Sequence, residues 1–353
     1  MSQEHQESDG EARPRRALVT GATGCIGRCL VRRLVEQGWS VNALVRDPRA
    51  FKEECGKLKA NGVRAIRGDL ADVSSLDDAT EGVEAIFHAA GKAHVDPRSP
   101  REEADFSAVN VTGTENLLRA GKKHGARTFI FFSTIGVYGP GAAGLLREKM
   151  PCRPQGAYAR SKCEAEQRVA ELADSGGTRA TVLRLSLVYG EGDRGNFLRM
   201  VQGIDAGRFF YVGNGESRKS MTYVENVADA ALLAAGKLLG RCEIFNVSDP
   251  SPYPLRLVVE TISKQLGVPT PKRHVPTSVM NVSGRLLESV GRLLRFRPPF
   301  TAADVRRLTT DAICDVSKIR ETLGFQAGIG LAEGVARTVR WYRDEQAKQP
   351  EGS

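Results

Sequence analysis

The sequence lacks several features that would assign it to particular classes of protein. No apolar run reaches the length of about 18 residues that a bilayer-spanning helix requires, and the polar, acidic start from Met1 to Gly10 is unlike a signal peptide. The 7 cysteines include no C-x-x-C pair, and no histidine or acidic residue lies close to Cys25 and Cys29. We therefore expect a cytoplasmic protein with reduced thiols and no metal site.

A nucleic-acid partner is also not expected, although the formal net charge is +9. The basic residues are spread along the chain and alternate with acidic ones. Aromatic residues make up only 6% of the chain and form no platform among the basic residues. A solvated surface, with a few arginines facing an anionic cofactor and substrate, explains this charge better.

What the sequence does contain is a regular alternation of strand and helix patterns. Short apolar runs typical of buried strands occur at 17–20, 41–45, 63–67, 85–88, 128–132 and 181–185. Helical periodicity is found at 26–37, 110–124 and 158–174. This alternation predicts an α/β fold with a doubly wound parallel sheet of the Rossmann type.

After Tyr189 and Gly190 the pattern loosens into glycine-rich loops, with one late strand at 242–247. We interpret this half as a smaller C-terminal substrate-binding lobe that caps the carboxyl edge of the sheet and is interleaved with the first domain. The expected organisation is a disordered tail at 1–14, a dinucleotide-binding domain at 15–190, the lobe at 191–346 and a tail at 347–353.

The glycine-rich turn after the first strand is typical of a loop that binds phosphate. It reads Gly21-Ala22-Thr23-Gly24-Cys25-Ile26-Gly27. Gly21 would allow the tight turn, Gly24 the close approach of the backbone to a pyrophosphate, and Gly27 the packing of the helix on the sheet. The amino terminus of that helix would then face the anion.

Tyr158 and Lys162 are four residues apart in a helical run, so both side chains share one helix face. A phenol with a pKa of about 10 is a poor base at neutral pH. An ammonium about 4 Å away would favour the phenolate by roughly 4 kcal/mol and would lower the pKa of Tyr158. Together with the glycine turn, this pair predicts hydride transfer to or from a carbon that bears a hydroxyl.

These motifs and their order resemble those of extended short-chain dehydrogenase/reductases of the NAD-dependent epimerase/dehydratase family. The matches run from Thr20 to about Tyr342. Besides the glycine turn and the Tyr–Lys pair, they comprise Gly68-Asp69-Leu70, His88-Ala89-Ala90-Gly91 and the segments 110–114, 133–139, 183–190, 315–318 and 323–325. The resemblance implies the Rossmann fold, NAD(P) as the cofactor and an enzyme that acts on a small molecule.

The resemblance also implies roles for individual residues. Thr134 stands where the relatives place the Ser or Thr that hydrogen-bonds the reacting oxygen, and its neighbour Ser133 is a weaker candidate. Tyr158 would be the acid/base, and Lys162 would hold the nicotinamide ribose. The implied cofactor-binding residues are Gly21, Gly24, Cys25, Ile26, Gly27, Asp69, Leu70, Ala89, Ala90, Gly91, Asn110, Tyr158 and Lys162.

One position departs from the pattern of NAD-preferring relatives, which usually end the second strand with an acidic residue that accepts the ribose hydroxyls. Val45 stands in that place and is followed by Arg46, whose guanidinium would favour a 2′-phosphate. Asp47 follows directly and could still reach a ribose. The expected cofactor is therefore NAD(P), with NADP somewhat favoured.

Three residues of the second lobe are candidates for substrate binding. Asn196 lies in the region where sugar-nucleotide relatives place groups at the diphosphate. Lys219 falls on the position of their diphosphate-binding Arg, and Arg218 precedes it. A cation there suits a nucleotide diphosphate. Arg306 and Arg307 are further candidates.

These residues lead us to expect a nucleotide-sugar 4-epimerase. Tyr158 would remove the C4 hydroxyl proton as hydride leaves C4, and the transient 4-keto sugar would be reduced on its other face. Ile135 and Gly136 replace the acidic pair that dehydratases carry after the residue matching Thr134. The alternatives are an NADPH-dependent nucleotide-4-keto-sugar reductase, a 3β-hydroxysteroid-type dehydrogenase and a non-enzymatic dinucleotide-binding protein. We expect a nucleotide sugar as the partner and a homodimer as the oligomeric state.

The stretch from Pro276 to Pro298 carries an apolar stripe with helical spacing. A membrane-surface helix would have such a stripe, with arginines beside it. More often the stripe packs against its own domain, so membrane association is not expected. The stripe consists of Val279, Val282, Leu286, Leu287, Val290, Leu293 and Leu294, and the arginines are Arg285, Arg292, Arg295 and Arg297.

Overall fold

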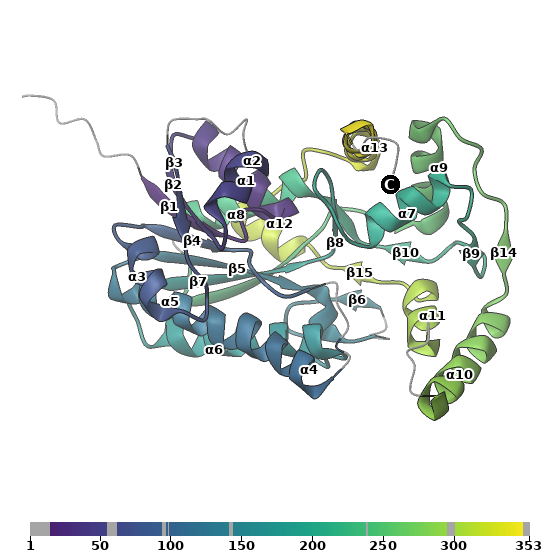
Figure 1. Cartoon of the computed structure of the whole chain (residues 1–353), viewed down its shortest axis with the longest axis horizontal. Helices are drawn as coiled ribbons and strands as arrows, with labels where there is room; N and C mark the ends of the chain where they lie inside the picture. The colour runs from purple at the N-terminus through teal and green to yellow at the C-terminus, as the bar shows by residue number, and fades with distance from the viewer. Residues whose placement is uncertain are drawn as a thin grey trace, which may run out of the picture.

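A seven-stranded sheet in which all neighbouring strands run parallel forms the centre of the molecule (Figure 1). The computed structural model describes residues 15–54, 62–93, 97, 99–140, 144–237, 239–294 and 301–348. In sheet order the strands are β12 (Cys242–Val247), β7 (Arg179–Leu185), β5 (Thr128–Thr134), β4 (Ala85–His88), β1 (Arg16–Thr20), β2 (Ser40–Val45) and β3 (Val63–Arg67). The predicted doubly wound parallel sheet is confirmed.

Strand β1 illustrates why helices cover both faces of this sheet. Its side chains alternate between two buried clusters, since Ala17 and Val19 lie in one and Leu18 lies in the other. Strands that are buried on both faces read as continuous apolar runs, which is the pattern the sequence presents. One face carries α1 (Cys25–Glu36) and α8 (Val224–Gly236), and the other carries α3 (Val73–Thr80), α5 (Gly113–Lys123) and α6 (Ala157–Asp174) (Figure 1).

The helix predicted at 110–124 starts earlier than expected and is not regular. Helix α4 (Pro100–Ser107) continues through a π-helical turn, η1 (Ala108–Thr112), into α5. A π-helical turn inserts an extra residue into a helix and is frequent at functional sites. Here the inserted turn contains Asn110, whose side chain is buried.

The strand order reverses between β1 and β4. From β1 the chain proceeds to β2 and β3 on one side, and it then crosses to β4, β5 and β7 on the other. Open α/β sheets bind ligands outside the carboxyl ends of the strands at such a switch point. The glycine turn follows β1, and Ala89, Ala90 and Gly91 follow β4, so both motifs lie at this place.

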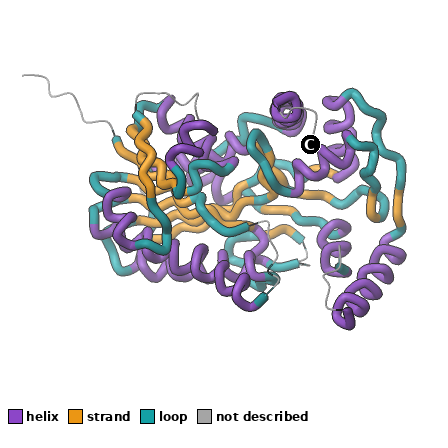
Figure 2. The backbone as a smooth tube through the Cα atoms, viewed as in Figure 1, coloured by secondary structure: helices purple, strands orange, loops and turns teal. Residues whose placement is uncertain are grey.

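The late strand predicted at 242–247 is β12, and it joins the large sheet beside β7. The other strands of the second half form two-stranded ladders, and helices and loops make up most of this part (Figure 2). The remaining elements are α2 (Pro48–Glu54), η2 (Ile135–Tyr138), β6 (Leu145–Leu146), β8 (Leu187–Tyr189), α7 (Asn196–Asp205), β9 (Tyr211–Val212), β10 (Arg218–Lys219), β11 (Met221–Tyr223), β13 (Tyr253–Pro254), α9 (Leu255–Leu266), β14 (His274–Val275), α10 (Thr277–Leu294), α11 (Ala302–Thr309), β15 (Ile313–Cys314), α12 (Ser317–Leu323) and α13 (Leu331–Lys348).

Helix α10 lies at one corner of the molecule beside α11 and away from the sheet (Figure 1, lower right). Val279, Val282 and Leu286 of its apolar stripe are exposed, whereas Leu287 is half-buried. The prediction that this stripe packs against its own domain is therefore wrong for these three residues. None of the helices within the described ranges is long and apolar enough to cross a membrane.

Some predictions fall on other parts of the chain. The predicted tail at 1–14 and the side chains of 290–294 lie outside the described residues, as do Cys55 and residues 349–353. Helix α13 continues to Lys348, two residues into the tail predicted from 347.

Candidate active site

The glycine turn brings three backbone segments into direct contact. Gly21 has a φ of 68°, and a Cβ at Gly21 would lie 2.7 Å from the amide nitrogen of Ala90. A Cβ at Gly27 would lie 2.1 Å from the carbonyl oxygen of Gly21. Gly24 is the residue before α1, and no side chain caps this helix within the described structure. The turn is therefore too closely packed for side chains at Gly21 and Gly27, and no N-cap side chain competes for the first amides of α1, which suits a pyrophosphate.

Other residues of the proposed cofactor set lie along the same sheet edge. Asp69 follows β3 and is exposed, and its carboxylate accepts a hydrogen bond from the Ala71 amide at 2.9 Å. Leu70 is buried, and Ala89 and Ala90 are half-buried after β4. The structure therefore brings this part of the predicted set to the carboxyl edge of the sheet, with Ala89 and Ala90 at the switch point and Asp69 and Leu70 beside the edge strand β3.

Gly91 lies between two further residues of the set. A Cβ at Gly91 would lie 3.2 Å from Oδ1 of Asn110 and 3.8 Å from Nζ of Lys162. The end of β4, the π-helical turn and α6 therefore meet at Gly91. A larger residue at Gly91 would press on both side chains.

Arg46 and Asp47 differ in their surroundings although they are neighbours. Arg46 is exposed at the end of β2. One carboxylate oxygen of Asp47 accepts hydrogen bonds from the amides of Arg49 (2.8 Å) and Ala50 (3.3 Å), at the start of α2. Asp47 is exposed as well, but one oxygen of its carboxylate is engaged by the helix that follows it.

His88 links the glycine turn to the π-helical turn through a buried chain of hydrogen bonds. Thr114 Oγ1 donates to the carbonyl oxygen of Asn110 (2.6 Å), so it must accept from Nε2 of His88 (2.8 Å). Nδ1 of His88 then accepts from Thr20 Oγ1 (2.7 Å), which accepts from the Ala90 amide (3.2 Å). This directionality fixes one tautomer, and complete burial lowers the pKa of His88 to about 3.

The side-chain amide of Asn110 is fully used within the protein. Its Nδ2 donates to the carbonyl oxygen of Lys92 (3.0 Å) and to Ser161 Oγ (2.9 Å), and its Oδ1 accepts from the Lys92 amide (2.7 Å). Ser161 Oγ in turn donates to the carbonyl oxygen of Tyr158 (2.9 Å). Asn110 therefore connects the loop after β4 to the first turn of α6, which is a positioning role.

Tyr158 and Lys162 occupy the first two turns of α6. Tyr158 is half-buried, and Lys162 is buried with its Nζ 4.1 Å from the centre of the Phe131 ring. Burial raises the pKa of Tyr158 to about 12. Burial also lowers the pKa of Lys162 to about 7, while the Glu166 carboxylate acts in the opposite direction. The expected lowering of the Tyr158 pKa is not found, because loss of hydration dominates for both groups.

The two adjacent hydroxyls at the end of β5 have different partners. Ser133 is buried, and its Oγ donates to the Glu166 carboxylate at 2.5 Å. Thr134 is half-buried, and its Oγ1 accepts from the Gly136 amide at 3.1 Å, which leaves its proton to donate elsewhere. A Cβ at Gly136 would lie 3.4 Å from Thr134 Oγ1 and 3.8 Å from the Ala159 Cβ, so Thr134 lies close to the start of α6.

Sequence reasoning missed the buried ion pair between Glu166 and Arg184. Their closest atoms are 2.7 Å apart, and the side chains are only 5% and 4% exposed. Arg184 also donates to the carbonyl oxygen of Glu148 (3.1 Å) and lies over the ring of Tyr138. The four-residue spacing between Lys162 and Glu166 could have revealed the carboxylate, because it places both on one helix face.

Two candidates of the second lobe lie on the surface. Asn196 is exposed at the start of α7, whereas Phe197 beside it is buried and stacks on Tyr189 with ring centres 4.6 Å apart. Arg306 is exposed on α11, and the side chain of Arg307 lies outside the described part of the chain.

The cations of β10 are engaged by the segment that follows α11. Nε of the exposed Arg218 lies 3.5 Å from the carboxylate of Asp311. Lys219 is half-buried, and its Nζ donates to the carbonyl oxygen of Thr310. Burial lowers the pKa of Lys219 to about 8. A diphosphate bound here would have to compete with these internal partners.

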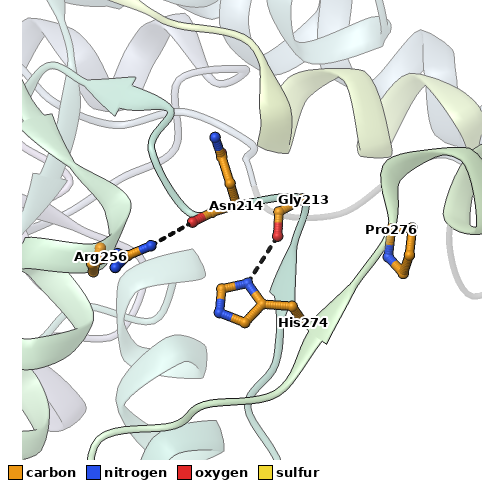
Figure 3. Close-up of a pocket in the computed structure, with 5 residues that line it drawn as sticks. All are labelled: Gly213, Asn214, Arg256, His274 and Pro276. Atoms are coloured by element: carbon orange, nitrogen blue, oxygen red, sulfur yellow. Dashed lines mark hydrogen bonds between the residues drawn. The ribbon is translucent and has the colours of Figure 1, made fainter.

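A cavity of about 370 Å³ lies in the second half, where β9, β14 and the start of α9 meet (Figure 3). Arg256 donates to the carbonyl oxygen of Asn214 (3.1 Å), and Nδ1 of His274 donates to that of Gly213 (2.9 Å). None of the candidate residues lines this cavity, so we do not assign the chemistry to it. Its lining is Gly213, Asn214, Arg256, His274 and Pro276.

Comparison with known proteins identifies the family of this chain. Residues 17–248 match the model of the NAD dependent epimerase/dehydratase family. The chain belongs to this family. It is therefore an enzyme of the extended short-chain dehydrogenase/reductase class that depends on NAD(P), as the motifs predicted.

Individual relatives of this family member differ in what they act on. A 2-alkyl-3-oxoalkanoate reductase of Stenotrophomonas maltophilia is 32% identical over 332 residues, which cover 91% of this chain and 97% of that protein. An N-acetyl-alpha-D-glucosaminyl-diphospho-ditrans,octacis-undecaprenol 4-epimerase of Escherichia coli O157:H7 is 26% identical. The matched residues cover 92% of this chain and 94% of that protein. The solved structure of MoeE5 in complex with UDP-glucose and NAD matches with a TM-score of 0.74 at 26% identity. The match covers 94% of this chain and 99% of the MoeE5 chain.

Proposed function

We propose that this enzyme interconverts a ketone and a secondary alcohol of a small molecule with NADP(H), and that it exchanges the dinucleotide at each turnover. The observation that carries the proposal is the end of β2. There the Arg46 guanidinium is exposed, while the Asp47 carboxylate is engaged by the amides that begin α2. A guanidinium beside a carboxylate that is already hydrogen-bonded to backbone amides suits a 2′-phosphate.

The state of Tyr158 supports the direction of reduction. With its pKa held near 12 by burial, the phenol is protonated at neutral pH and can donate. When bound, the reduced dinucleotide supplies a hydride to the carbonyl carbon. Tyr158 donates its proton to the carbonyl oxygen, and the Thr134 hydroxyl hydrogen-bonds the same oxygen. Lys162, with a pKa near 7, can return a proton to the phenol and hold the ribose.

Relatives support the ketone as the substrate class. The protein of Stenotrophomonas maltophilia with 32% identity is named as a reductase of 2-alkyl-3-oxoalkanoates. A ketoreductase of Stigmatella aurantiaca, which is named for a farnesylated quinoline oxide, is 30% identical over 325 residues. Both names describe a ketone within a larger, partly apolar molecule. We propose this class of ketone as the substrate of the present enzyme. We do not propose the particular compound that either relative is named for.

A nucleotide-sugar 4-epimerase is the second candidate. The similarity to the Escherichia coli 4-epimerase and to MoeE5 favours it. So does Lys219, which by the family resemblance falls on the position of a diphosphate-binding Arg. Against it stand the internal partners of Arg218 and Lys219, which are Asp311 and Thr310.

We also propose the division into domains at 15–190 and 191–346, a homodimer as the oligomeric state and a cytoplasmic location.

One experiment separates the two candidates. The purified enzyme is incubated with NADPH and a panel of ketones that includes β-keto acids, a steroid ketone and a nucleotide 4-keto sugar, and NADPH absorbance is followed. A second assay measures interconversion of UDP-hexoses without added dinucleotide. Consumption of NADPH with one ketone supports the proposal. Epimerisation without added cofactor contradicts the proposal and selects the epimerase.

Two tyrosine variants control this experiment. Tyr158→Phe should lower NADPH consumption by about 10² to 10⁴-fold, because it removes the acid/base. Tyr211→Phe removes the same atom from a buried tyrosine of β9, a strand that lies away from the large sheet (Figure 1), and should keep the wild-type rate. Equal rates for wild type and Tyr158→Phe would refute the assigned mechanism.

A further inference from the structure

Helix α10 presents an apolar face to solvent. Val279, Val282 and Leu286 are 52%, 67% and 64% exposed. Their spacing places the three side chains within about 60° of one another around the helix, so they form one continuous stripe. Exposed apolar side chains that cluster in this way mark interaction sites, whereas single ones are ordinary.

The opposite side of α10 anchors the helix to the protein. Gly284 is buried there, and Met280 and Leu287 are half-buried. Helix α11 packs beside α10, and its Leu308 is also 49% exposed. Figures 1 and 2 show the two helices at the corner of the molecule farthest from the sheet, and in this view no other described helix or strand lies beyond α10. The apolar face of this attached helix is thus available to a partner.

The stretch of sequence that contains this face is strongly basic. Arg285 is exposed at the margin of the stripe, and Lys272 and Arg273 are exposed shortly before α10 begins. In the sequence from 272 to 297, Glu288 is the only acidic residue. The basic residues of this stretch are Lys272, Arg273, Arg285, Arg292, Arg295 and Arg297.

We propose that the apolar face of α10 binds to the surface of an anionic lipid bilayer. A helix lying in the plane of the interface buries its apolar stripe among the acyl chains while its arginines reach the phosphates. A second copy of this chain is the less suitable occupant, because it would bring an equally basic segment against the first. The proposal does not depend on the substrate of the enzyme.

Sedimentation with lipid vesicles tests this proposal on the full-length protein. Wild type should sediment with vesicles that contain phosphatidylglycerol and much less with pure phosphatidylcholine, and added salt should weaken the binding. The double variant Val282→Asp/Leu286→Asp should lose about tenfold or more of its affinity for the anionic vesicles. The control Leu257→Asp alters an apolar residue of α9 that is 44% exposed and should bind like wild type.

Three outcomes would overturn the proposal. The first is that wild type does not bind the anionic vesicles. The second is that the double variant binds as tightly as wild type, which would assign binding to another surface. The third is a wild-type dimer that the double variant dissociates, without vesicle binding, which would assign the face to a second copy. If the aspartate variant does not fold, Val282→Ser/Leu286→Ser replaces it, since both side chains are exposed.

Discussion

Ser133 Oγ donates a hydrogen bond to the Glu166 carboxylate across 2.5 Å, whereas Oγ1 of its neighbour Thr134 accepts one from the Gly136 amide. This relationship separates two adjacent hydroxyls that the sequence could not distinguish. The Ser133 hydroxyl serves a buried ion pair, because Glu166 also binds Arg184. The Thr134 hydroxyl retains a proton to donate at the end of β5.

We expect different effects from removing these two hydroxyls. Thr134→Ala should lower kcat by about 10² to 10³-fold, the usual loss for one donor to a reacting oxygen, and should lower the free energy of unfolding by about 1 kcal/mol, because the Gly136 amide loses its cap. Ser133→Ala should leave kcat close to wild type but lower the free energy of unfolding by about 1 to 3 kcal/mol, because the buried carboxylate loses a donor. Steady-state kinetics and urea unfolding measure the two quantities. A Ser133→Ala enzyme that is inactive but fully stable would reverse the assignment.

The lowered pKa of Lys162 predicts a pH dependence of stability. Between about pH 7 and the reference lysine value near 10.5, the unfolded chain binds a proton at this residue that the folded chain does not. The free energy of unfolding contributed by Lys162 should therefore rise with pH through this window. Urea unfolding at several pH values should show a steeper rise for wild type than for Lys162→Met. The exposed Lys123→Met variant should follow wild type, and parallel curves for wild type and Lys162→Met would contradict the burial argument.

The hydrogen-bond chain through His88 predicts its tautomer. Nitrogen NMR should find the proton on Nε2 and should find His88 neutral well below pH 6, since burial lowers its pKa to about 3. His274 is a matched control, because its Nδ1 donates to the carbonyl oxygen of Gly213 and the neutral ring should carry the opposite tautomer. A proton on Nδ1 of His88 would mean that the chain of hydrogen bonds runs the other way.

The exposed guanidinium at the end of β2 predicts the cofactor preference. Wild type should bind NADP(H) more tightly than NAD(H), and Arg46→Ala should reduce this preference by about 1.5 to 3 kcal/mol, the contribution of one charge-assisted contact. Fluorescence titration of wild type and variant with both dinucleotides measures this difference in affinity. Arg64→Ala removes the same charge from the exposed face of β3 and should change nothing. Tighter binding of NAD(H) by wild type would refute the role of Arg46.

The sequence was sufficient to predict the sheet and the cradle, because both depend on local chemistry. The apolar run of β1 followed by Gly21, Gly24 and Gly27 permits few other structures. The order of the motifs along the chain then identified the family and, with it, Tyr158 and Lys162 as candidates.

Features that depend on the tertiary surroundings could not be predicted from the sequence. The periodicity of α10 is the same whether Val282 and Leu286 face the protein or solvent, so only the structure could decide its orientation. The burial that raises the pKa of Tyr158 is contributed by other elements. The partner of Asp47 was likewise undecidable, because a carboxylate beside a strand end can turn to a ribose or to the next helix.

The position of β12 has a consequence for the synthesis of this protein. β12 pairs with β7, yet the whole stretch from Ser186 to Arg241 must leave the ribosome before that pairing can form. Until then the outer edge of β7 exposes unpaired amides and carbonyls, which can pair with strands of other chains. A nascent chain that stalls before residue 242, or a fragment that ends at Gly190, would carry this open edge and would depend on chaperones to avoid aggregation.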